Sequence, residues 1–72
     1  MKPGDLVRST SHTNASPNWG NSHGSFMVGE NSLGVVLEMN TITFGSDEHR
    51  EVAKVLFPRG IGWVFTRTLL ED

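Results

Sequence analysis

The chain contains no cysteine among its 72 residues, and it has no tyrosine. Without cysteine it can form neither a disulfide framework nor a thiolate metal site, so a small apolar core must stabilise the fold. No apolar run approaches the roughly 18 residues of a membrane-spanning helix, and the opening segment MKPGDLVRS lacks the apolar stretch of a secretory signal. We therefore expect a protein that is neither secreted nor embedded in a membrane.

Positive charge is also scarce. The net charge is −2 with neutral histidines, and the six basic residues are scattered along the chain. Non-specific binding to nucleic acid or to anionic membranes requires clusters of lysine and arginine. The composition therefore disfavours both of these ligands.

Apolar residues are unevenly distributed. From Leu33 onward the chain is apolar and strand-like, whereas residues 9–32 are mostly serine, threonine, asparagine, glycine and histidine. A segment of this length without a period is long for a loop in a compact domain, and such loops are usually functional or disordered. Trp19 and Phe26 lie within it, together with Met27 and Val28. These side chains either attach the loop to the core or contact a partner.

Alternating patterns predict strands over residues 6–8, 33–39, 51–57, 61–65 and 69–71, with a short helical turn at 66–68. In the second strand, the alternation places Val35, Leu37 and Met39 on one face. Residues 40–50 are expected to connect the second and third strands. Within this connection, residues 41–44 are a candidate extension of the strand, followed by a turn at residues 45–47.

The stretch VLFPRGIGWVF, residues 55–65, predicts an antiparallel hairpin. Pro58-Arg59-Gly60 is a turn signal, because proline presets the backbone angle of a turn and glycine tolerates a positive one. Trp63 is expected in the core, on one face with Ile61 and Phe65. Gly62, on the other face, allows another backbone to approach closely.

Three motifs together resemble a known family: PGDLVR at residues 3–8, LGVVLE at 33–38, and AKVLFPRGIGWVFTRTLLED at 53–72. They resemble small, stand-alone SH3-like barrels, and they are similar to largely uncharacterised proteins encoded by tailed bacteriophages, marine ones in particular. The resemblance implies a single all-β domain over residues 1–72, a barrel of about five short antiparallel strands. The long polar loop 9–32 follows the first strand, at the position of the RT loop of SH3 domains.

The missing tyrosines distinguish the chain from peptide-binding SH3 domains, whose grooves contain them, so we do not expect polyproline recognition. The opening GD.V and the following G.V are also similar to KOW-type barrels of ribosomal and transcription proteins. That likeness implies nucleic-acid binding as an alternative, with Arg8, Arg59, Arg67 and Trp19 as its candidate contacts.

No catalytic, cofactor-binding or metal-binding residues are expected. His12, His23 and His49 are too widely spaced for a zinc site without cysteine. The carboxylates at positions 47, 48 and 51 belong to a solvated turn, and no serine or glycine motif of an enzyme is present.

The sequence therefore predicts a non-enzymatic protein-binding module, encoded by a phage and located in the virion or the host cytoplasm. It would be a minor virion or assembly component, or a factor directed at a host protein. The candidate contact residues combine aromatic, thioether and guanidinium side chains, types common at interface hot spots or well suited to polar contacts: Trp19, Phe26, Met27, Arg59 and Arg67. A homo-oligomer is a further possibility, through an exposed patch formed by Val36, Leu56 and Val64.

Overall fold

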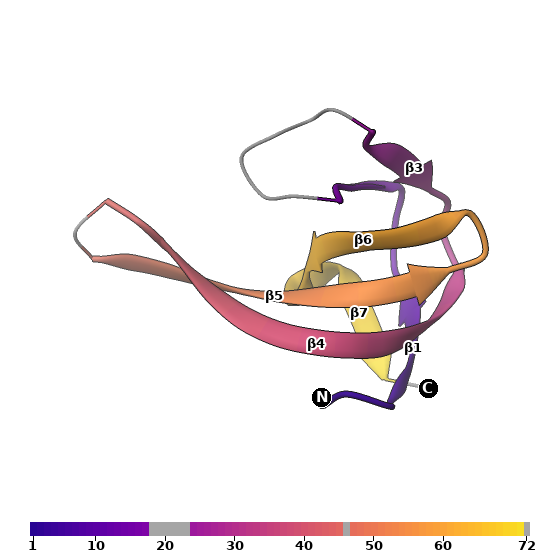
Figure 1. Cartoon of the computed structure of the whole chain (residues 1–72), viewed down its shortest axis with the longest axis horizontal. Coiled ribbons are helices and arrows are strands. Elements are labelled where there is room, and N and C mark those ends of the chain that lie inside the picture. The colour runs from indigo at the N-terminus through magenta and orange to yellow at the C-terminus, as the bar shows by residue number, and fades with distance from the viewer. Residues whose placement is uncertain (18–23, 46, 72) are drawn as a thin grey trace.

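The computed structural model describes residues 1–17, 24–45 and 47–71, and these residues form an antiparallel β structure without an α-helix (Figure 1). Its elements, in chain order, are β1 (Leu6–Ser9), β2 (Thr13–Ala15), β3 (Phe26–Val28), β4 (Leu33–Phe44), β5 (Glu48–Phe57), β6 (Gly60–Phe65), the 3-10 turn η1 (Thr66–Thr68) and β7 (Leu69–Glu71). The all-β class and the helical turn before the last strand are confirmed. No helix in the described part of the chain is long and apolar enough to span a membrane.

The strands form a five-stranded sheet in the order β6-β5-β4-β1-β7 and a separate pair, β2-β3. All pairs are antiparallel. Within the described residues the ladder does not close into a barrel, because β6 and β7 are its two edge strands. The predicted unbroken loop at 9–32 is wrong in part, since β2 and β3 lie within it.

The β2–β3 pair is attached to the edge of β6 through Ser16 and Trp63. Their backbones exchange two hydrogen bonds, of 3.2 and 2.7 Å. Gly62 makes this approach possible, because a Cβ atom at that position would lie 2.7 Å from the Cβ of Ala15. The close backbone approach predicted at Gly62 is confirmed.

Ser9, at the end of β1, binds the residues that follow β3. Its side chain is fully buried, and its hydroxyl donates a hydrogen bond of 2.6 Å to the carbonyl oxygen of Gly29. The Ser9 backbone also bonds to Ser32 and Asn31, at 2.9 and 2.8 Å. A buried hydroxyl that finds a partner avoids the cost of an unsatisfied polar group, so this polar residue is part of the fold.

The core consists mainly of small apolar side chains. Its buried members are Val7, Ala15, Val28, Val36, Ala53, Val55, Phe57, Val64 and Leu69, with Phe26 and Met39 packed against them. The prediction that Trp63 belongs to the core is wrong: Trp63 is only partly buried, because Gly62 and Val64 take the inward positions of β6.

A β-bulge interrupts the alternation of β4 between Val36 and Glu38. The extra residue, Leu37, is exposed, so both Val36 and Met39 turn toward the core. The prediction that Val35, Leu37 and Met39 share a face is therefore wrong. A strict period of two cannot reveal a bulge, since it follows from pairing with the neighbouring strand.

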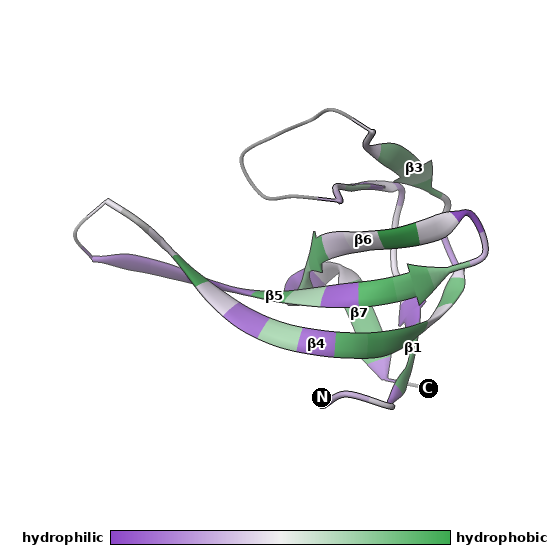
Figure 2. Ribbon diagram, viewed as in Figure 1, coloured by the Kyte–Doolittle hydropathy of each residue, from purple (hydrophilic) through white to green (hydrophobic). Residues whose placement is uncertain are grey.

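Beyond Asn40, β4 and β5 continue as a two-stranded ribbon. The residue pairs from Thr41 with Glu51 to Phe44 with Glu48 lie past Val52, where the pairing of β5 with β6 ends. Figure 1 shows this ribbon projecting from the rest of the molecule, and Figure 2 shows its β5 side as hydrophilic. We call residues 41–45 and 47–51 the arm. The expected strand extension at 41–44 is confirmed, but most of the predicted connection at 40–50 is strand.

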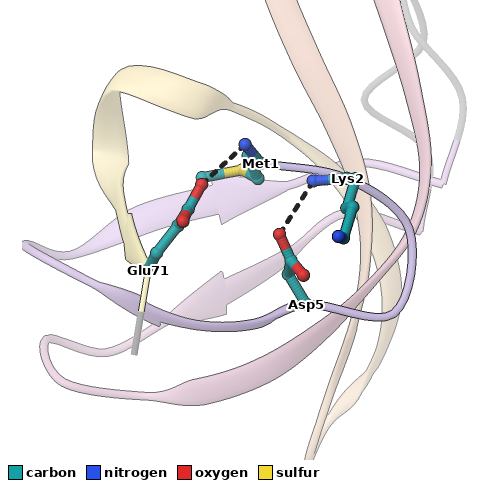
Figure 3. Close-up of polar contacts among 4 residues, drawn as sticks. All are labelled: Met1, Lys2, Asp5 and Glu71. Carbon is teal, nitrogen blue, oxygen red and sulfur yellow. Dashed lines mark hydrogen bonds and ion pairs between the residues drawn. The ribbon is translucent and has the colours of Figure 1, made fainter.

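The amino terminus is attached to the last strand. The amino group of Met1 lies 2.6 Å from Oε1 of Glu71, and the backbone amide of Lys2 donates a 3.0 Å hydrogen bond to the carboxylate of Asp5 (Figure 3). The hydrogen bond to Glu71, together with its charge, raises the pKa of the Met1 amine above its ordinary value of 8.0.

Replacing Gly62 with alanine tests the contact between β2 and β6. The added methyl group would overlap Ala15, whose backbone cannot move without breaking the Ser16–Trp63 pair. We expect Gly62→Ala to reduce the free energy of unfolding by about 1–3 kcal/mol, measured by urea denaturation. Gly29→Ala is the matched control, because a Cβ there would meet ordinary contacts no closer than 3.8 Å. Equal stability of the two variants would contradict this account.

The Met1–Glu71 ion pair predicts a dependence of stability on pH. Because folding raises the pKa of the amine, the stabilisation is complete below about pH 8 and is lost as the pH rises through the folded-state pKa. We expect the melting temperature of the wild type to exceed that of Glu71→Gln at neutral pH, and the two to converge in strongly alkaline buffer. A difference that is independent of pH would exclude the ion pair as its cause.

Candidate functional site

Large apolar side chains are aligned across the outer face of the five-stranded sheet. The pairing registers place Leu6 opposite Val35, Val35 opposite Leu56, and Leu56 opposite Ile61. Directly paired residues point to the same side of a sheet, so these four form one row across β1, β4, β5 and β6. Leu6 is 53% exposed, and Leu56 and Ile61 are each 45% exposed. The row therefore faces solvent.

An open hollow of ≈ 350 Å³ lies along this row. It is lined by Leu6, Leu33, Gly34, Val35, Leu56, Phe57 and Pro58. In Figure 2 the corresponding parts of β1, β4 and β5 are hydrophobic. The row and the lining of the hollow together contain six outward-facing apolar residues. We call them the apolar strip: Leu6, Leu33, Val35, Leu56, Pro58 and Ile61.

The strip differs from the apolar patch that the sequence predicts. Leu56 is exposed as expected, but Val36 and Val64 are each only 1% exposed and belong to the core. Val36 turns inward with Gly34, its neighbour on the same face of β4, and Val64 lies beside Ala53 in the sheet. The predicted patch is therefore wrong in two of its three members.

Leu6, Leu33 and Ile61 were not among the candidates from sequence. Each lies next to a position that turns inward, so the alternation could have indicated that they face outward. The pattern within one strand does not say which residues of other strands lie beside them, because that depends on the register.

Three of the predicted contact residues lie together. The guanidinium group of Arg59, at the turn between β5 and β6, donates a 3.5 Å hydrogen bond to the carbonyl oxygen of Met27 in β3. A Cβ at Gly60 would lie 3.6 Å from the ring of Phe26. Met27 is exposed, whereas Phe26 is half-buried against the core. This corner adjoins the strip through Pro58, which precedes Arg59.

The other two predicted residues are not part of this corner. Arg67 lies in η1, with its guanidinium carbon 5.2 Å from the ring centroid of Phe65. Such a cation–π contact is worth roughly 0.5–1 kcal/mol at an exposed site. Trp19 lies outside the described residues, so its role stays a prediction.

Charge is divided between the arm and the rest of the chain. The arm contains three acidic residues, Asp47, Glu48 and Glu51, and a single base, Arg50. The other five acidic and five basic residues cancel, so the whole net charge of −2 lies in the arm.

Charged residues of both signs lie near the strip. Arg8 pairs with Leu33, and Asp5 precedes Leu6. Lys54 lies two residues before Leu56 on β5 and faces Glu38.

Across the described residues, no three histidine, aspartate or glutamate side chains gather as a metal ion would require. His49 in the arm lies near the hydroxyl of Thr43, with 3.2 Å between Nδ1 and Oγ1. The absence of metal, cofactor and catalytic residues stays a prediction from the sequence.

Comparison of the chain with protein-family models, with curated proteins and with solved structures found no match.

Two single substitutions at neighbouring positions of β5 test which face of the sheet is exposed to solvent. Leu56→Ser changes an exposed side chain, and we expect the free energy of unfolding to change by no more than about 0.5 kcal/mol. The neighbouring Val55→Ala removes two buried methyl groups and should cost about 2 kcal/mol. Urea denaturation of both variants at low protein concentration measures this difference. A loss of stability as large for Leu56→Ser as for Val55→Ala would show that the strip is part of the core.

Proposed function

We propose that the chain is an SH3-like barrel that acts as a non-enzymatic protein-binding module, with the apolar strip as its binding surface. Support for the barrel comes from the strand order, in which the last strand pairs with the first and follows a 3-10 turn. The β2–β3 excursion after the first strand corresponds to an RT loop. This excursion begins after β1, and its contact with β6 attaches it to an edge strand of the five-stranded sheet.

The exposed row across four strands is the observation that supports protein binding. Burying a leucine side chain that is otherwise exposed contributes roughly 1.5–3 kcal/mol. A chain of 72 residues that leaves Leu6, Leu56 and Ile61 about half exposed forgoes much of this stabilisation. Contiguous apolar surface on a small protein is typical of a site that a partner covers.

The biological setting follows from the resemblance to phage-encoded barrels. On that basis the module is a minor virion or assembly component, or a factor directed at a host protein. Its place is correspondingly the virion or the host cytoplasm.

A KOW-like barrel that binds nucleic acid is the second candidate. The cation–π contact of Arg67 with the half-buried ring of Phe65 favours it, because arginine and aromatic side chains together can take part in base stacking. However, the three arginines of that hypothesis lie in β1, in the β5–β6 turn and in η1, and the arm is acidic. These features favour a protein partner over a phosphate backbone.

A photo-crosslinking residue at Leu33 tests the proposed function. We expect ultraviolet light to produce a discrete covalent adduct with protein in lysate of the producing cells, and Leu56→Glu in the same chain to abolish it. The same residue placed at the exposed Glu30 is the control, and it should not produce that adduct.

Two results would contradict protein binding at the strip. Identical adducts from positions 33 and 30 would indicate random collision, and an adduct removed by nuclease treatment would favour the nucleic-acid hypothesis.

A further inference from the structure

The two sides of the β4–β5 ribbon differ in chemistry. Residues 39–44 of β4 contain no charged residue, no proline and no glycine, whereas residues 48–51 of β5 include three charged residues. Exposed strand edges pair readily with other chains, and natural proteins prevent this pairing with charges and prolines. The β4 side of the ribbon therefore lacks the protection that the β5 side has.

Two hydrogen bonds show which backbone groups point away from the ribbon. The amide of Thr41 donates a 2.9 Å bond to the side-chain oxygen of Asn40. The carbonyl oxygen of Glu51 accepts a 3.3 Å bond from the hydroxyl of Thr66. Thr41 and Glu51 lie directly opposite each other, so theirs is a pair that exchanges no backbone hydrogen bonds across the ribbon.

The orientation of Thr41 recurs at every second residue of β4, because bonded and non-bonded pairs alternate in an antiparallel ladder. Met39 and Thr43 share it, since the register with β5 is regular from Glu38 to Phe44. Among the described residues no strand pairs with β4 on this side, because its pairing with β1 covers Leu33 to Val35 (Figure 1). We call the backbone of residues 39–44 on this side the free edge.

We propose that two copies of this chain join through the free edge, with their β4 strands antiparallel about a two-fold axis at Thr41. Thr41 then lies opposite Thr41 of the second copy, and Met39 lies opposite Thr43. Each of these pairs has outward-pointing backbone groups in both chains, so each exchanges two hydrogen bonds. The contact uses a different surface from the apolar strip, so it goes beyond the proposed function and does not depend on it.

The position of the axis follows from where the free edge ends. An axis at Asn40 would require the bulge at Leu37 to pair, and an axis at Ile42 would require Gly45 in the turn to pair. Bulges and turns interrupt a regular ladder. Thr41 is the centre at which all of the outward-pointing residues of the free edge find a partner.

The side chains fit a second copy as the occupant of the free edge. Asn40 faces Ile42 of the other chain, and the acidic Glu38 faces the uncharged Phe44. Like charges therefore do not meet across the axis, and threonine beside threonine is a favourable cross-strand pair.

The contact also stabilises the ribbon. A two-stranded ribbon is marginally stable in water, whereas three or more strands can form a stable sheet. The pairing joins two ribbons into one sheet with the strand order β5-β4-β4-β5, whose outer strands have charged residues at positions 48, 50 and 51. Charged outer edges resist further pairing, so the assembly is closed at two chains.

Opposite charges introduced at Thr41 test the axis. Thr41→Lys places two lysines opposite each other, and Thr41→Glu does the same with two carboxylates, so we expect each variant alone to dimerise roughly tenfold more weakly than the wild type. An equimolar mixture should form a mixed dimer at least as readily as the wild type dimerises, because lysine then faces glutamate. Sedimentation velocity with one variant fluorescently labelled measures this association.

Two variants are the controls. His49→Lys adds a charge at an exposed position of the neighbouring strand, away from the axis, and it should dimerise like the wild type. Leu56→Glu changes the apolar strip and should leave the dimer unaffected. Thr41 is itself exposed, so its variants should fold like the wild type, as judged by circular dichroism.

Hydrogen exchange measured by NMR locates the contact. As the protein concentration rises, the exchange of the Met39 and Thr43 amides should slow, because these amides become bonded to the second copy. The amides of Asn40 and Ile42 point toward β5 and should change little.

Three results would overturn the proposal. A wild type that stays monomeric at every concentration leaves the free edge without a second copy, and a mixture that associates no better than its two components excludes an axis at Thr41. Complexes of more than two chains would contradict a closed assembly. The crosslink from Leu33 reports on the apolar strip alone, so the failure of either proposal can be told from the failure of the other.

Discussion

The close approach of Gly62 to Ala15 holds the two sheets of this protein together. No side chain separates the two backbones, so Ser16 can pair with Trp63 and the β2–β3 pair lies against the edge of β6. This placement brings Ala15 and Val28 into the core, which the five-stranded sheet alone would leave open. Hydrogen bonds at Ser9 and at Ser16 hold the polar segment with β2 and β3 in place. They are made by its backbone and by one buried hydroxyl group.

The same close packing explains how the apolar residues are distributed. Where the backbones lie so near one another, the interior admits valine and alanine, and the largest fully buried apolar side chains are all valines. Phe57 and Leu69 are the larger side chains of the core, whereas the other leucines and Ile61 are exposed. Since a small core must be filled without voids or overlap, the larger side chains remain available at the surface. The apolar strip is thus a consequence of a core too thin to contain it.

The β-bulge at Leu37 changes which face of β4 is turned toward the core. Before the bulge, β4 lies between β1 and β5, and beyond it β4 pairs with β5 alone. Past Asn40 and Val52 only the ribbon of β4 and β5 remains, and on it Glu48 forms an ion pair with Arg50. One continuous pair of strands therefore contributes both to the apolar strip and to a polar ribbon.

The class of the fold and most of its strands could be predicted from the amino-acid pattern alone. The alternation of apolar residues and the turn residues predict the strands from β4 to β7 and the turn at residues 58–59. Gly62 predicts the close approach of another backbone, but it does not say which segment supplies that backbone. These features are local, because they depend on the period of two and on the angles that proline and glycine prefer. Of the candidate contact residues, Phe26, Met27 and Arg59 lie together, whereas Arg67 lies on another element.

Which apolar residues face solvent depends on the pairing of the strands in three dimensions. Leu6, Val35, Leu56 and Ile61 form a row because of three strand registers, and no segment of the chain contains that information on its own. The inward turn of Met39 required the bulge, and the outward position of the partly buried Trp63 required a glycine on the inner face of β6. Each of these outcomes depends on what the neighbouring strand places opposite the residue, and that is a property of pairing between distant parts of the chain.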